Sequence, residues 1–345
     1  MTIGQKKVRR VAVIMGGWSG EREVSLSSAQ GVIKALDGRG YEVIPIDLTR
    51  DLREFLQKLL QARPDVVFMN AMHGRWGEDG CLQGLLEMLG LPYTNSGVLA
   101  SALAMDKPFA RKIFKDEGGI PCPEGFVAER SRVMAGGIMP CPYVIKPLQE
   151  GSSLGVHIIT DEAQLRDIED IWEYGDQVLV ERYISGREIQ VAVLGDRAWG
   201  AIEICPHAGF YDYTAKYTDG KAKHLMPAPI HPQAYQMALD LAKRAHDALG
   251  CEGVTRVDMR YDDTKGEPGT FYVLEVNTQP GLTPLSLVPE IVAYHGMSYG
   301  DLVEWMIKNP RHLVSQAVMT SHPFERTAPY GESKEWVVEN PSRFS

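Results

Sequence analysis

The chain has 345 residues, of which 44% are hydrophobic and 23% charged, the balance of an ordinary globular protein with two or three domains. Its net charge of −9 provides no overall attraction to nucleic acid or to an anionic membrane. Its five cysteines are widely spaced and contain no CxxC pair, which argues against a disulfide framework or a zinc site and favours a reducing cytoplasm.

No apolar run precedes Val11, so a signal peptide is not expected, and no stretch is long and apolar enough for a membrane span. Residues 11–15 are continuously apolar, as a buried parallel strand is. Apolar residues at helical spacing follow, with Ser25 as the expected cap and Gly38 as the expected stop. Further strands are expected at 41–46 and 65–69, and helices at 52–60 and 82–89. This alternation predicts an α/β fold with a doubly wound parallel sheet.

A second unit begins near Gly97 with a helix expected over 102–114, after which prolines and glycines interrupt the pattern. Strands are then expected at 143–146, 156–160, 178–182, 188–194 and 199–204, and a helix at 234–249. Segments 254–261 and 271–276 have the pattern of an antiparallel pair joined by a polar turn. The expected domains are 1–97, 98–186 and 187–310, followed by a polar tail at 311–345.

A glycine- and serine-rich loop at 150–155 lies between two expected strands, shortly after Lys146. Glycines let backbone amides approach a phosphate, and serine hydroxyls add donors. The loop is neither a Walker A loop nor GxGxxG, because it has no GKT and no following helix. A plain hairpin is the alternative, but Lys146 supplies a point charge for a polyphosphate. The segment is therefore a candidate phosphate-binding loop.

Polar residues interrupt the otherwise apolar antiparallel pair. Glu275 and Asn277 share a face of their strand, and pairing brings Asp258 beside them. Oxygen ligands of this kind suit Mg²⁺, and a polar sheet face is the alternative. Arg256 lies on the same face as Asp258 and could stabilise an oxyanion in acyl transfer, with a salt bridge to Glu275 as the alternative.

Two loops follow the first and third strands, at 16–21 and 73–80. Doubly wound sheets bind their ligands at this edge. Glu21 in the first loop could bind a substrate ammonium group. The alternative is a charge that faces the dipole of the following helix.

Together these segments resemble the D-alanine–D-alanine ligases of the ATP-grasp superfamily, over about residues 11–307. The resemblance rests on the motifs GGWSGEREVSL, HGRWGEDG, SGVLASALAMDK, VIKPLQEGSSLGV, GFYDYTAKY, TRVDM and LEVNTQPGLTPLSLVP, in unbroken order. It implies that a two-lobed ATP-grasp fold of α+β character follows the N-terminal α/β sheet. The family pattern usually ends near Lys308, so the tail is a departure.

The resemblance also implies roles for residues that match these motifs. Glu21 resembles the acid that holds the first D-alanine's ammonium, and His73 the histidine near its carboxylate. Ser152 resembles the serine that links Glu21 to the lid tyrosine, Tyr217. The further roles are: ATP binding by Lys107, Lys146, Ser152, Glu181, Tyr183, Ile184, Glu188 and Phe210; a lid position for Lys216; an oxyanion hole of Arg256 and the Gly281 amide; magnesium ligation by Asp258, Glu275 and Asn277; and the second D-alanine carboxylate at Ser286 and Leu287.

The implied activity is ATP-dependent formation of D-alanyl-D-alanine for peptidoglycan through an acyl phosphate. ATP is a substrate, two Mg²⁺ ions are the expected cofactor with Mn²⁺ as a substitute, and the chain is expected to be a cytoplasmic homodimer. Relatives that make D-alanyl-D-lactate have a histidine in the lid, so Tyr217 favours the peptide product. The alternatives are an ATP-grasp carboxylate–amine ligase with another acceptor and a regulatory ATP-binding module without catalysis.

Overall fold

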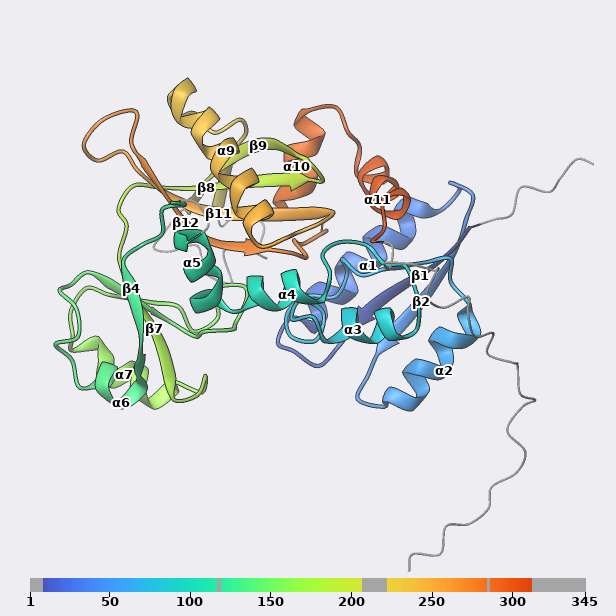
Figure 1. Cartoon of the computed structure of the whole chain (residues 1–345), viewed down its shortest axis with the longest axis horizontal. Coiled ribbons are helices and arrows are strands. Elements are labelled where there is room, and N and C mark those ends of the chain that lie inside the picture. The colour runs from blue at the N-terminus through green and yellow to red at the C-terminus, as the bar shows by residue number, and fades with distance from the viewer. Residues whose placement is uncertain (1–8, 117–118, 207–221, 284–285, 312–345) are drawn as a thin grey trace, which may run out of the picture. The chain divides into compact units, whose positions relative to one another are not determined.

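The structure is a computed structural model and describes residues 9–116, 119–206, 222–283 and 286–311 (Figure 1). The chain divides into two units, 1–312 and 313–345, and every described residue lies in the first. The domain boundaries expected within that unit stay predictions. No helix among the described residues has the length and apolar character needed to cross a bilayer.

The N-terminal sheet is parallel, with the order β2 (Tyr41–Leu48), β1 (Arg9–Gly16) and β3 (Val66–Phe68). Residues 11–14 of β1 are fully buried, because α1 (Arg22–Leu36) and α2 (Leu52–Ala62) pack against the sheet (Figure 1). The predicted parallel sheet is therefore confirmed. The loops after β1 and β3 leave the same edge of the sheet, where α3 (Cys81–Met88) follows the second of them.

The expected cap of the first helix is wrong. Helix α1 begins at Arg22 with Glu21 in the N-cap position. Ser25 is fully buried, and its hydroxyl accepts a hydrogen bond from the Gly16 amide (2.8 Å) and donates one to the Ala71 carbonyl. A serine hydroxyl bonds to any backbone group within reach, and here the partners are the last residue of β1 and the segment that follows β3. Ser25 therefore ties the end of β1 to the loop after β3.

The single helix expected over 102–114 is two helices, α4 (Val98–Met105) and α5 (Lys107–Asp116). They meet at Asp106, whose backbone is extended and whose carboxylate accepts a hydrogen bond from the Phe109 amide (3.1 Å). Pro108 lies in the first turn of α5, where its missing N–H costs nothing. The break places Lys107 at the very start of α5.

The remaining described strands form two antiparallel sheets, in agreement with the expected two-lobed fold. In one, the order is β4 (Gly125–Glu129), β7 (Gln177–Arg182), β5 (Tyr143–Lys146) and β6 (His157–Ile159). Its core is shared with α6 (Arg130–Met134) and α7 (Gln164–Ile171). In the other, the order is β10 (Ala222–Leu225), β9 (Arg197–Pro206), β8 (Arg187–Leu194), β11 (Val254–Asp262) and β12 (Thr270–Asn277). Helices α9 (Pro232–Ala248) and α10 (Leu287–Tyr294) pack on this second sheet, and α11 (Tyr299–Lys308) packs on α1.

The expected antiparallel pair is confirmed as β11 and β12. Its register places Arg256 opposite Asn277 and Asp258 opposite Glu275, and a β-bulge follows Asp258. Beyond the bulge, Met259 and Tyr261 of β11 and Phe271 and Val273 of β12 are buried core residues, whereas Arg260 is partly exposed. The register thus brings the polar side chains of Arg256, Asp258, Glu275 and Asn277 together on one side of the bulge.

Candidate functional site

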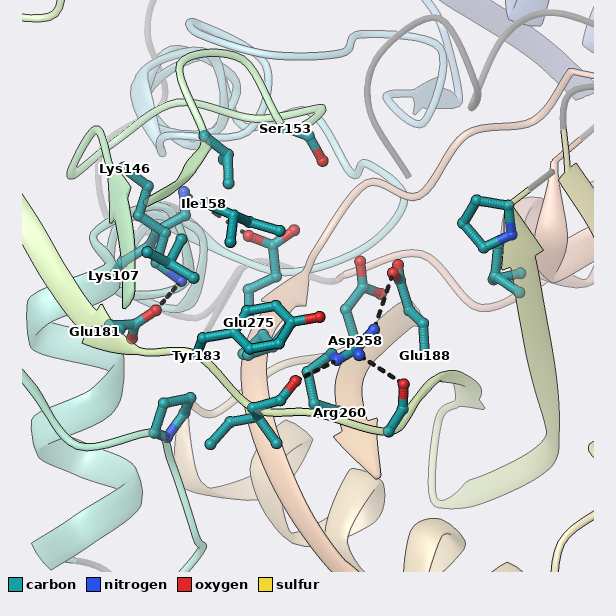
Figure 2. A pocket seen from close by; sticks show the side chains of 18 of the residues that line it. Lys107, Lys146, Ser153, Ile158, Glu181, Tyr183, Glu188, Asp258, Arg260 and Glu275 are labelled. Atoms are coloured by element: carbon teal, nitrogen blue, oxygen red, sulfur yellow. Dashed lines mark hydrogen bonds and ion pairs between the residues drawn. The ribbon is translucent and has the colours of Figure 1, made fainter. Parts of the chain in front are cut away.

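A pocket of about 380 Å³ lies between the two antiparallel sheets (Figure 2). Its apolar walls include Val144 and Ile158 from one sheet and Ile204 from the other. Charged side chains line much of the rest of it. The sequence-predicted residues that it brings together are Lys107, Lys146, Glu181, Tyr183, Ile184, Glu188, Asp258 and Glu275. A pocket with apolar walls and lysines suits a ligand that has a flat apolar part and a polyanionic part.

The two lysines meet buried carboxylates inside this pocket. The Lys146 ammonium contacts one oxygen of Glu181, whose other oxygen contacts the guanidinium of Arg111 from α5. The Lys107 ammonium lies 3.7 Å from a carboxylate oxygen of Glu275 and donates a hydrogen bond to the backbone carbonyl of Glu150. Lys107, Lys146 and Glu181 are largely buried and Glu275 is partly buried, so these charges act in a weakly screening environment.

Burial, followed by the positive charge of Lys107, lowers the pKa of Lys146 to about 7. The Glu275 carboxylate acts in the opposite direction and raises the pKa, and the ion pair with Glu181 likewise stabilises the ammonium form. An anionic ligand in the pocket would do the same. Lys146 is therefore a group whose protonation depends on what occupies the pocket.

At the other end of the pocket, Arg260 holds the segment that follows β7. Its guanidinium donates to the Ile184 carbonyl (3.2 Å) and the Gly186 carbonyl (2.7 Å). It also lies 3.8 Å from a Glu188 oxygen and 6.0 Å from the ring centroid of Tyr183 (Figure 2). This arginine thus fixes the residues expected to contact adenosine.

The candidate metal ligands lie where the hairpin register places them. Asp258 and Glu275 both line the main pocket, and Asn277 lines a small pocket next to it that Glu275 and Lys107 share. Arg256 forms a bidentate ion pair with Asp258, with N–O distances of 2.7 and 2.9 Å. Neither partner is free to move far, since both are largely buried.

These oxygen donors fit a magnesium ion. Two carboxylates and one amide oxygen are the ligand types that Mg²⁺ takes, with water and phosphate oxygens completing the shell. Three protein ligands would leave positions of the magnesium shell open, and phosphate oxygens could fill them.

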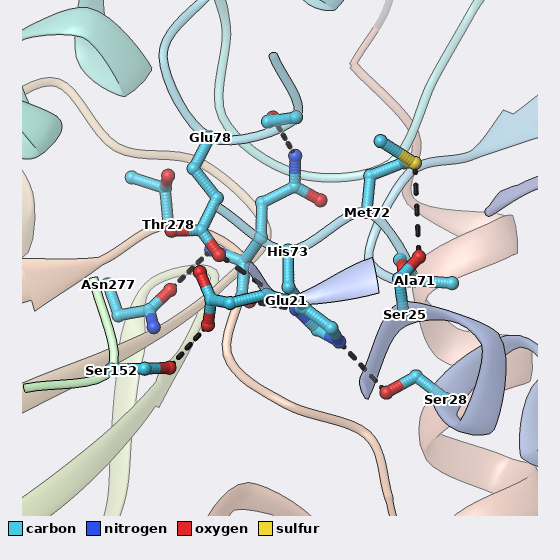
Figure 3. Close-up of polar contacts among 12 residues, drawn as sticks. Glu21, Ser25, Ser28, Ala71, Met72, His73, Glu78, Ser152, Asn277 and Thr278 are labelled. Carbon is cyan, nitrogen blue, oxygen red and sulfur yellow. Dashed lines mark hydrogen bonds and ion pairs between the residues drawn. The ribbon is translucent and has the colours of Figure 1, made fainter. Parts of the chain in front are cut away.

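A second polar group lies at the edge of the N-terminal sheet (Figure 3). The Ser152 hydroxyl donates a hydrogen bond to the carboxylate of Glu21, which is 5% exposed. The His73 ring is bonded at both nitrogens, with Nε2 at 2.8 Å from the Ser28 hydroxyl and Nδ1 at 3.2 Å from the Gln279 carbonyl. A carbonyl only accepts, so Nδ1 is protonated. The serine of loop 150–155 and the N-terminal loops thus meet at one place.

Ser286 lies at the N-cap of α10, and Leu287 is its first residue. The Ser286 hydroxyl accepts a hydrogen bond from the Thr283 amide (2.9 Å) and lies 2.9 Å from the Thr283 hydroxyl. A Cβ at Gly281 would approach the Ser286 oxygen to 2.8 Å, which explains the glycine. A helix N-terminus offers unpaired amides to a carboxylate. Phe210, Lys216 and Tyr217 lie outside the described residues.

Sequence reasoning missed three residues of the site. Arg260 lies two and four residues after Asp258 and Arg256 on the same strand, so alternation could have identified it. Arg111 lies one helical turn after Lys107, and helical spacing could have identified it. Ser28 has no local signal, because its bond to His73 joins residues 45 positions apart.

Models of two families match the chain. The D-ala D-ala ligase N-terminus matches residues 10–65 and 53–96, and the D-ala D-ala ligase C-terminus matches residues 131–308. A D-alanine–D-alanine ligase of Paramagnetospirillum magneticum is 53% identical over 305 residues, which cover 88% of this chain and 99% of that protein.

Solved structures of the same family are also similar to the chain. The Bacillus anthracis D-alanine–D-alanine ligase complexed with ATP has a TM-score of 0.72 at 32% identity, covering 88% of this chain and 96% of its own. The VanG D-Ala:D-Ser ligase of Enterococcus faecalis has a TM-score of 0.71 at 31% identity, covering 87% and 98%. With the lysines, the acids and the Glu21–Ser152 contact in one arrangement, the chain belongs to the D-alanine–D-alanine ligase family.

Proposed function

We propose that this protein joins two D-alanine molecules into D-alanyl-D-alanine for peptidoglycan synthesis, with conversion of ATP to ADP and phosphate. The observation that best supports this is the meeting of three parts: a pocket with two buried lysines, the hairpin acids, and the Glu21–Ser152 contact. The name shared by relatives at about 50% identity supports the same reaction.

In the first step, a carboxylate oxygen of one D-alanine bonds to the γ-phosphorus of ATP, and the bond from that phosphorus to the β-phosphate oxygen breaks. Lys107 and Lys146 hold the phosphates and offset the negative charge at the transferring group. Glu21 binds the ammonium of this D-alanine, with Ser152 fixing the orientation of its carboxylate. His73, held at both ring nitrogens, faces the substrate carboxylate.

In the second step, the amine of the other D-alanine bonds to the activated carbonyl carbon, loses a proton, and inorganic phosphate leaves. Arg256 and the Gly281 amide stabilise the oxyanion. Ser286 and the N-terminus of α10 bind the carboxylate of the second substrate. The family resemblance assigns Tyr217, which lies outside the described residues, a preference for an amine over a hydroxyl acceptor.

Asp258, Glu275 and Asn277 would hold two Mg²⁺ ions, or Mn²⁺, which supply positive charge at the phosphates when bound. Arg256 orients the Asp258 carboxylate through both of its oxygens. The Glu275 carboxylate, 3.7 Å from Lys107, links the metal ligands to a phosphate-binding lysine.

We place the reaction in the cytoplasm, which five unpaired cysteines support, and we expect a homodimer. The decisive experiment incubates the protein with ATP, Mg²⁺ and D-alanine and identifies the product by mass spectrometry. The expected product is D-alanyl-D-alanine with one phosphate released for each dipeptide.

D-serine and D-lactate serve as competing acceptors in the same assay. This competition matters because a D-Ala:D-Ser ligase has nearly the same fold similarity to the chain as a D-alanine–D-alanine ligase. A mixed product made mostly with D-serine would reject the proposed acceptor, while phosphate release without any dipeptide would reject the ligase activity itself.

A further inference from the structure

Two tryptophans join the loops that follow β1 and β3. Trp18 belongs to the loop at 16–21, and Trp76 to the loop at 73–80. Their ring centroids are 5.2 Å apart with the planes tilted by 42°. The guanidinium of Arg75 lies 5.0 Å from the Trp76 ring centroid. Such ring pairs stabilise a contact beyond the area that they bury.

Trp76 holds this position in an unfavourable backbone conformation. Its φ is +78°, in the left-handed region that bulky residues rarely adopt. The local backbone is tied down, because the Trp76 amide donates to Asp79 (3.2 Å) and its carbonyl accepts from Leu82 (3.1 Å). A glycine would adopt this conformation without strain. A tryptophan here therefore indicates that its ring performs a task that offsets the strain.

The two loops touch closely beside the ring pair. The Ser19 hydroxyl donates to the His73 carbonyl (3.3 Å), and a Cβ at Gly74 would approach the Glu21 carboxylate to 2.5 Å. Glu78 in the second loop lies 3.8 Å from His73. Small shifts between the loops would consequently change how Glu21 and His73 face each other.

We propose that Trp18 and Trp76 are positioning residues for the first D-alanine. Their contact fixes loop 16–21 against loop 73–80, and so sets the place of Glu21 relative to His73. The inference rests on the proposed function, because that function assigns the first D-alanine to Glu21 and His73. A displacement of about 1 Å at a reacting group can lower a rate by on the order of a hundredfold.

The test compares Trp76→Gly, Trp76→Phe and Trp18→Leu with a control, Trp199→Phe, whose ring pairs with His295 instead. In Trp76→Gly the relief of backbone strain partly offsets the loss of the ring contact, so its Tm should stay close to that of the wild type. We expect its KM for the first D-alanine to rise by about tenfold to a hundredfold. The KM for ATP should stay unchanged, and Trp76→Phe should restore most of the loss.

Hydrogen exchange gives a readout that does not depend on the reaction. Backbone amides of residues 16–21 should exchange faster in Trp76→Gly, and should be unchanged in Trp199→Phe. An unchanged exchange rate, or an unchanged KM for the first D-alanine in an active enzyme, would overturn the proposal. If the Tm falls and the KM values for ATP and for both D-alanine molecules rise together, the rings contribute only to the stability of the core. A wild type that makes no dipeptide would reject the proposed function, while hydrogen exchange would still decide whether the rings hold the loops.

Discussion

The buried contact between Arg111 and Glu181 makes a prediction about stability. Arg111 contacts one oxygen of Glu181 and donates to the Pro123 carbonyl (2.6 Å), and the two charged side chains are only 13% and 3% exposed. Breaking a buried ion pair by removing one partner costs about 3–5 kcal/mol. Lys146 remains beside Glu181 in Arg111→Met, so we expect the lower end, about 3 kcal/mol. The Arg111 guanidinium is largely removed from solvent, and this burial lowers its pKa.

The assay is urea unfolding of Arg111→Met, Arg111→Lys and Lys112→Met, followed together with ATP affinity. Lys112 is the exposed neighbour on the same helix, and its substitution should change the free energy of unfolding by less than about 0.5 kcal/mol. Arg111→Lys keeps the charge but not the forked geometry, and should fall between the two. ATP should bind more weakly to Arg111→Met, since Glu181 would no longer be held against Lys146. Wild-type stability of Arg111→Met, or effects that simply add when it is combined with Glu181→Gln, would refute the reasoning.

Four other outcomes follow from the site. The pKa of Lys146 in the free enzyme is about 7, and bound phosphates would raise it, so ATP binding at pH 8 should take up a proton. This uptake would appear as a binding enthalpy that depends on the buffer. Lys146→Arg should remove the dependence, and a buffer-independent enthalpy in the wild type would contradict the prediction. Arg256→Ala should lower turnover by roughly 10²–10³-fold with ATP affinity retained, and loss of ATP binding would instead make Arg256 a phosphate-binding or structural residue. Glu275→Gln should abolish ligation more completely than Asn277→Ala with the fold intact, and near-normal turnover at saturating Mg²⁺ would disprove the metal assignment. Tyr217→His should raise the ratio of D-alanyl-D-lactate to D-alanyl-D-alanine, most at slightly acidic pH where the imidazolium forms, and an indifferent ratio at every pH would remove Tyr217 from acceptor choice.

Strands that have a continuous apolar run or a regular polar–apolar alternation could be predicted from the sequence. The apolar run of β1 and the alternation in β11 and β12 place those strands, and the register then brings Asp258 opposite Glu275. The break between α4 and α5 could not be placed as easily, because Asp106 can either extend a helix or cap the next one. Helix α10 was missed because its valines and proline are poor helix formers, and packing on the second sheet decides its structure.

Contacts between distant segments left little trace in the sequence. Serine is a residue type favoured at helix N-caps, but Ser25 instead forms hydrogen bonds with the backbone of Gly16 and Ala71. The ion pair between Arg111 and Glu181 joins a helix to a strand 70 residues away, and no local sequence pattern predicts this pairing. The residues of the candidate site could be predicted mainly from the resemblance to a family. Local periodicity carries no information on long-range contacts, whereas the motifs of a family combine residues that are distant in the sequence.

The pairing of Arg256 with Asp258 has a consequence for how this site can change. One carboxylate serves both a proposed metal ligand set and the proposed oxyanion donor. Altering the charge or length of either side chain would disturb both at once, so an intermediate variant would lose two properties before it gained a new one. Replacement of the pair would therefore require simultaneous changes, and design efforts that aim at a different metal or acceptor should leave these two residues together.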